Sequence, residues 1–131
     1  MKTRLESGIA GLVLIALFAF MGDPVRAAQP SGFTFTPKFK DPDPGKRTWE
    51  KQGNRYIETL PSGRTNTFRV WKETTVKGLN GTIVQKVEEP NFYVFIADSE
   101  AARPELWWWR DKGPWNFMGR MENIRAPHRI D

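Results

Sequence analysis

The sequence predicts an all-β domain, a small antiparallel meander of about seven strands that curls into a barrel or half-barrel. From Thr48 onward, short apolar segments alternate with turns rich in glycine, proline and asparagine, and no window of three turns has helical periodicity. Strands joined by short turns pair antiparallel, and closing the sheet removes aggregation-prone edges. A barrel of this size fills its interior with side chains, so we expect no deep ligand cavity.

The first 27 residues are typical of a signal peptide. Lys2 and Arg4 precede an apolar run over 9–21, and small residues at the −3 and −1 positions predict cleavage after Ala27. The run is shorter than the roughly 20 residues that a membrane-spanning helix needs. We therefore expect an exported protein, periplasmic or extracellular, with no stable transmembrane span after signal cleavage. An uncleaved anchor is the alternative.

Residues 28–47 are expected to form an extended arm or linker. Phe33 and Phe35 alternate with threonine, but Pro37 restricts this stretch to an edge strand or an arm. The prolines that follow exclude a helix before residue 47. We expect the phenylalanines over 33–39 to hold the arm across the domain, and the alternative is a flexible spacer.

The β domain is predicted over 48–122, followed by a tail over 123–131 that frays. Asn80-Gly81 between apolar runs predicts a two-residue hairpin turn, because both residues tolerate positive φ. The segment 92–97 is apolar at every position, which predicts a central strand buried on both faces. The expected strands cover 49–52, 56–60, 65–73, 76–79, 82–87 and 92–97, with a hairpin over 106–120.

Composition restricts the partners that we expect. Removing 1–27 takes three basic and two acidic residues from totals of 20 and 15, which leaves 17 and 13 and a net charge of +4. The basic residues are spread along the chain, so no nucleic acid partner is expected. The chain has no cysteine, so its stability must come from its own core, for which the many aromatic residues supply the material.

The residues offer little for catalysis. There is no cysteine nucleophile, the single histidine, His128, lies in the predicted tail, and no phosphate-loop, dinucleotide or metalloprotease motif occurs. We therefore predict no cofactor, no metal site and no catalytic residue. A carboxylate-dependent hydrolase is an alternative reading because paired carboxylates hydrolyse glycosides. Its candidate residues are Glu50, Glu58, Glu73, Asp98, Glu100 and Glu105.

The hairpin over 106–120 holds four of the six tryptophans of the chain. A four-residue loop would place Trp108 opposite Phe117 and Trp107 opposite Met118. One face would then carry Leu106, Trp108, Arg110, Trp115 and Phe117, and we expect it to face the core. The other face would carry Trp107, Trp109, Asn116, Met118 and Arg120.

The second face carries the predicted ligand-binding residues, Trp107, Trp109, Asn116 and Arg120. Flat rings beside hydrogen-bonding groups suit a glycan, and tryptophan and arginine also favour a protein partner in the cell envelope. We therefore predict a non-enzymatic binding module. One alternative is that the phenylalanine arm over 33–39 or a neighbouring strand covers this face as ordinary packing. Another is a self-associating structural protein of the envelope, which would form homo-oligomers through this hairpin.

Overall fold

The computed structural model describes residues 28–38, 40, 43–111 and 113–127. Within them the chain forms one antiparallel sheet of nine strands, which confirms the predicted all-β fold. The described residues contain no helix with the length and apolar character needed to cross a membrane. The expected signal peptide over 1–27 lies outside the described residues.

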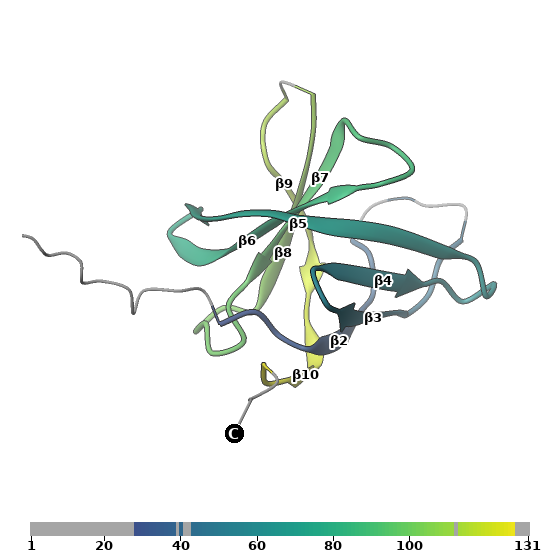
Figure 1. Cartoon of the computed structure of the whole chain (residues 1–131), viewed down its shortest axis with the longest axis horizontal. Coiled ribbons are helices and arrows are strands. Elements are labelled where there is room, and N and C mark those ends of the chain that lie inside the picture. The colour runs from purple at the N-terminus through teal and green to yellow at the C-terminus, as the bar shows by residue number, and fades with distance from the viewer. Residues whose placement is uncertain (1–27, 39, 41–42, 112, 128–131) are drawn as a thin grey trace, which may run out of the picture.

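The strands follow one another as a meander. From β2 to β9 each strand pairs with its neighbour in sequence, and β10 pairs with β2. In Figure 1, β5 crosses the molecule and joins the β2–β4 region to the β6–β9 region. The strands are β2 (Gly32–Phe35), β3 (Arg47–Gln52), β4 (Arg55–Thr59), β5 (Thr65–Val76), β6 (Leu79–Lys86), β7 (Phe92–Ala97), β8 (Glu105–Arg110), β9 (Asn116–Arg120) and β10 (Glu122–Arg125).

The two ends of the sheet meet, so the sheet forms a nearly closed barrel. Strand β10 pairs with β2, with Glu122 opposite Thr34. The chain beyond β2 then runs beside β9, where the Lys38 amide donates a hydrogen bond to the Met118 carbonyl at 2.9 Å. The edge strands of the sheet are β9 and β10, and only Met121 separates them. The segment that contains β2 and the residues after it contacts both of these edge strands, which closes the barrel.

The sequence predicted an edge strand or an extended arm before residue 47 and a fraying tail after residue 122. A strand does form, but β2 has a partner on both sides, and β10 takes the place of part of the tail. The segment expected as an arm over 28–47 contributes β2, and the tail expected over 123–131 contributes most of β10. The two strands pair across 88 residues of sequence. A local pattern of apolar and turn residues holds no information about such a distant pairing.

The barrel interior is filled at one end by stacked aromatic rings. Trp49 lies between Phe33 and Phe68, with ring centroids 5.4 and 4.4 Å away, and Tyr56 packs beside it at 5.8 Å. All four side chains are buried.

Strand β7 is buried on both faces of the sheet from Val94 to Ala97, as the apolar sequence of this strand predicts.

The hairpin between β5 and β6 turns at a different place from the predicted one. Val76 pairs with Leu79, so the two turn residues are Lys77 and Gly78, with φ of 55° and 79°. Two positive φ values match the twist of a tight hairpin. The predicted turn at Asn80-Gly81 is wrong because both residues belong to β6. A Cβ on Gly81 would meet a carbonyl oxygen and a ring of β7, so this glycine permits close packing of two strands.

The barrel interior next to the aromatic stack is not filled, since Phe68 of the stack and Glu58, which accepts a hydrogen bond from Trp49, line a hollow. The hollow, of about 330 Å³, opens between β3, β4, β5, β6, β7, β8 and β9. We call this hollow the barrel mouth. Its lining includes Arg47, Lys86 and Arg110, long side chains that extend along the walls. The prediction that side chains fill the whole interior is therefore wrong at this place.

Candidate functional site

The tryptophan hairpin pairs β8 with β9 in a register that differs from the predicted one. Trp107 lies opposite Phe117 and Trp108 lies opposite Asn116, while Leu106 lies opposite Gly119. Between these pairs β9 carries one residue more than β8. A shift of one residue exchanges the two faces of a strand. Phe117 therefore lies on the face of Trp107 and not with Trp108.

The predicted site residues do not all share one face. Trp107 and Trp109 lie on the same face, which points away from the barrel interior, and Arg120 joins them through its pairing with Glu105. Asn116 lies opposite Trp108, on the interior face, and its amide donates to the Pro114 carbonyl at 2.9 Å. The expected grouping of Asn116 with the two tryptophans is therefore wrong.

Trp107 is a half-buried packing residue. Its Nε1 donates to Oε1 of Glu105 at 3.1 Å, its ring meets Phe117 edge-on at 5.4 Å, and the Lys77 ammonium lies 5.1 Å from the ring centroid. These contacts come from the hairpin and its neighbours. The arm runs beside β9, but its described rings, Phe33 and Phe35, are buried inside the barrel and make no ring contact with Trp107. Phe39 lies outside the described residues.

Trp109 belongs to a continuous row of rings on the outer face. The row runs from Trp71 through Tyr93 and Trp109 to Trp115, with successive centroids 5.2, 5.0 and 5.7 Å apart. Trp71 is 49% exposed. A register shift between Val70 and Lys72 marks a β-bulge at Trp71, and a bulge redirects side chains at such a position. Sequence reasoning missed Trp71 as a site residue because a bulge leaves no local signal in the apolar pattern.

Three tryptophans of this row surround an open hollow of about 250 Å³, which we call the outer groove. Val76 and Ile83 form its apolar floor, since both are buried side chains in its lining. The remaining lining residues are Trp71, Lys72, Thr74, Thr75, Trp109 and Trp115. The groove thus combines flat apolar rings with one threonine, Thr74, and one lysine, Lys72, as polar lining residues, while the Thr75 hydroxyl already donates to Asn80 Oδ1 at 2.8 Å.

Neither hollow has the carboxylate pair that a glycoside hydrolase needs. Among the described residues, the outer groove has no acidic lining residue, and the barrel mouth has only Glu58. The Glu58 carboxylate accepts hydrogen bonds from Trp49 Nε1 and Asn66 Nδ2, both at 2.8 Å. No three acidic, histidine or cysteine side chains of the described part gather as metal ligands.

Comparison with known proteins adds no assignment. No family model, no curated protein and no solved structure matches the chain. A function must therefore be inferred from the hollows of the structure and the residues that line them.

Proposed function

We propose that the protein is an exported, non-enzymatic module that binds a glycan in the outer groove. One observation carries the proposal. Trp71 of β5 converges with Trp109 of β8 and Trp115 before β9 on one hollow, although Trp71 is distant in sequence from the other two. Thr74 and Lys72 supply polar groups at the same hollow.

The chemistry of the groove matches that of a sugar chain. A sugar ring in which most hydroxyls are equatorial has an apolar face, and such a face stacks on a tryptophan ring. Its hydroxyls exchange hydrogen bonds at the edges, where Thr74 and Lys72 lie. The Lys72 ammonium lies over the Trp71 ring, 4.4 Å from its centroid, so a sugar that stacks on this ring face displaces the ammonium. The groove is open, so a longer chain can continue past it.

A large protein partner fits the same surface less well. A stable protein interface removes roughly 800 Å² from each partner and contains a buried apolar centre. Among the described residues, the exposed large hydrophobic side chains are Trp71 and Val87, at 49% and 38%. The apolar surface offered is therefore small and concave, which suits a ligand the size of a few sugar residues.

The proposal is tested by calorimetric titration of the exported form, beginning at Ala28, with cellohexaose and chitohexaose. These β-linked chains have equatorial hydroxyls and apolar ring faces. We expect one of them to bind, and Trp71→Ala to weaken binding about thirtyfold, in keeping with roughly 2 kcal/mol for a tryptophan at a binding hot spot. Thr74→Val should weaken it less, because it removes one hydroxyl and keeps the shape.

Val87→Ala is the matched control, because Val87 is the other exposed large apolar residue among the described ones and does not line the groove. It should leave glycan affinity unchanged. If neither sugar binds, or if Trp71→Ala has no effect on binding, the proposal is contradicted. Light scattering tests self-association directly: a dimer lost on Trp71→Ala would assign the groove to a second copy of the chain.

A further inference from the structure

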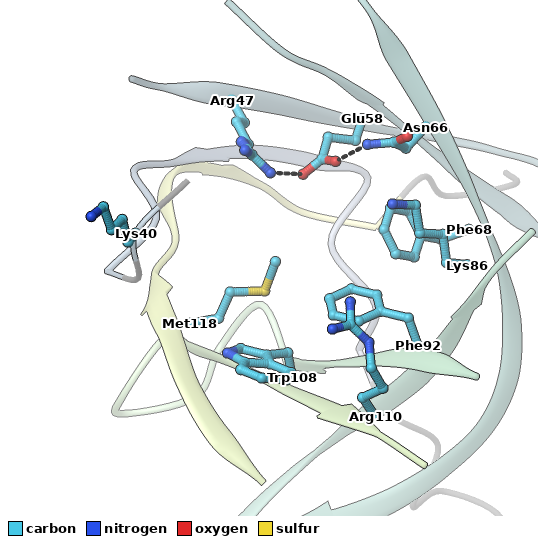
Figure 2. Close-up of a pocket in the computed structure, with 10 residues that line it drawn as sticks. All are labelled: Lys40, Arg47, Glu58, Asn66, Phe68, Lys86, Phe92, Trp108, Arg110 and Met118. Carbon is cyan, nitrogen blue, oxygen red and sulfur yellow. Dashed lines mark hydrogen bonds and ion pairs between the residues drawn. The ribbon is translucent and has the colours of Figure 1, made fainter. Parts of the chain in front are cut away.

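The barrel mouth is a second hollow, separate from the outer groove. The two lie on opposite faces of the sheet, since Trp108 lines the mouth and the next residue, Trp109, lines the groove. Figure 2 shows the lining side chains of the mouth arranged around an open space. Phe68, Phe92, Trp108 and Met118 form its apolar wall.

Buried charge stands on one side of the mouth. Glu58 is 1% exposed and Arg47 is 5% exposed, and Nη1 of Arg47 lies 3.5 Å from Oε2 of Glu58. Removing two charges from water is costly unless hydrogen bonds compensate them. Trp49 and Asn66 supply such bonds to Glu58. This part of the lining is therefore fixed in position and polar.

The rim of the mouth is cationic. Lys40, Lys86 and Arg110 join Arg47 in the lining, against one lining carboxylate, Glu58. Glu89 stands outside the lining and pairs with two of the cations, at 3.0 Å from Arg110 and 3.8 Å from Lys86. All three of these side chains are solvent-accessible, at 46% for Arg110, 38% for Glu89 and 21% for Lys86. Such exposed pairs contribute little to stability, so another carboxylate can compete with Glu89.

The cations also lie against the aromatic wall. The Arg110 guanidinium is 5.1 Å from the Phe92 centroid and 5.9 Å from that of Trp108, and the Lys86 ammonium is 5.6 Å from that of Phe92. A ligand that enters the mouth therefore meets positive charge and ring faces together. A bare inorganic anion would leave the apolar wall without a partner, and a neutral hydrocarbon would leave the cations without one.

We propose that the barrel mouth binds a small organic anion with a flat apolar body, such as an aromatic carboxylate. The body lies between Phe92, Trp108 and Met118. The carboxylate lies at the rim, where Arg110 and Lys86 replace their contacts to Glu89 with contacts to the ligand. The volume of about 330 Å³ falls at the lower end of the range for small-molecule pockets, so one bicyclic ring system with its acid group fills it.

The test uses two probes of nearly the same shape, 2-naphthoate and its neutral amide, 2-naphthamide, titrated calorimetrically into the exported form. We expect 2-naphthoate to bind at least about tenfold more tightly than 2-naphthamide, because only the acid pairs with the cations. Equal affinity for the two probes, or no binding of either one, would overturn the proposal.

Two variants with opposite expected effects sharpen the test. Arg110→Gln should weaken 2-naphthoate about fivefold, the size of one partly exposed ion pair, and leave 2-naphthamide nearly unchanged. Glu89→Gln should strengthen 2-naphthoate by a few-fold, because it removes the competing carboxylate. A purely structural role for Glu89 predicts unchanged or weaker binding instead, so that result would contradict the proposal.

Trp71→Ala is the control for binding elsewhere, since Trp71 lines the outer groove and not the mouth. It should leave 2-naphthoate affinity unchanged. Loss of 2-naphthoate binding in Trp71→Ala would place the probe in the outer groove and overturn the assignment to the mouth. Thermal melting of each variant confirms that it is folded under the titration conditions.

Discussion

Truncating Trp107 and Trp71 in separate variants tests which of these two tryptophans stabilises the fold and which is exposed for ligand binding. Both side chains point away from the barrel interior, yet their surroundings differ. Trp107 is half-buried and hydrogen-bonded to Glu105, whereas Trp71 is 49% exposed and its ring contacts are to Tyr93 and the Lys72 ammonium. We expect Trp107→Ala to lower the free energy of unfolding far more than Trp71→Ala does.

The magnitudes follow from these contacts. Truncating a fully buried tryptophan costs about 3–5 kcal/mol. Trp107 keeps part of its surface in water, but its loss also removes the Nε1 donor from the buried Glu105 carboxylate, so we expect about 2–3 kcal/mol. Trp71→Ala removes little buried area and one ring pair, which corresponds to about 0.5–1 kcal/mol.

Urea unfolding followed by circular dichroism measures both free energies, and Trp107→Phe serves as a matched control. Phenylalanine keeps a ring against Phe117 and loses the hydrogen bond to Glu105, so its cost should be about half that of alanine, roughly 1–1.5 kcal/mol. If Trp71→Ala destabilises the protein as much as Trp107→Ala, the distinction between a packed and a presented tryptophan fails.

Three further predictions concern the barrel itself. Gly81→Ala should cost about 1–3 kcal/mol because its Cβ would overlap a carbonyl of β7, while Gly113→Ala, with its nearest atom 3.4 Å away, should stay within about 0.5 kcal/mol in the same urea assay. Trp49→Phe should keep the ring stack and remove the donor to buried Glu58, which lowers the unfolding free energy by about 1.5–3 kcal/mol. An unchanged urea midpoint for this variant would refute that role. Burial, with nearby negative charge, raises the pKa of Asp98, so its ionised form destabilises the folded state. Asp98→Asn should therefore melt at a higher temperature than the wild type at pH 7, and this advantage should disappear as the pH falls below about 3.9, the ordinary aspartate pKa. Equal melting temperatures at pH 7 would argue against it.

The fold class and most strands were predictable because their signals are local. Phe92 to Ala97 is apolar at every position, and the short turns between segments indicate antiparallel pairing. The turn at Lys77-Gly78 was not predictable, because the stronger hairpin motif three residues later serves close packing against β7 instead. The pairing of β2 with β10 links distant segments, and no local pattern reports it.

The candidate sites were predictable only in part. Spacing by two residues places Trp107 and Trp109 on one face of β8, as the structure has them. One extra residue in β9 reversed the expected faces of Asn116 and Phe117. Trp71 lines the outer groove because a β-bulge in β5 redirects its side chain, and the sequence pattern does not show this bulge. The barrel mouth draws its lining from seven strands and the segment before β3, so its charges meet only after the sheet has closed.

Closure by β2 and β10 has a consequence for the order of folding. The first strand of the described sheet pairs with the last one, across 88 residues. During synthesis the earlier strands emerge first and can pair locally, but the barrel cannot close until the chain is almost complete, because such a distant contact must overcome the entropy of a long loop. Until then β2 and β9 are open edges that can pair with other chains. A chain that ends before Glu122 would leave β2 permanently without its β10 partner, so truncation there should produce aggregation.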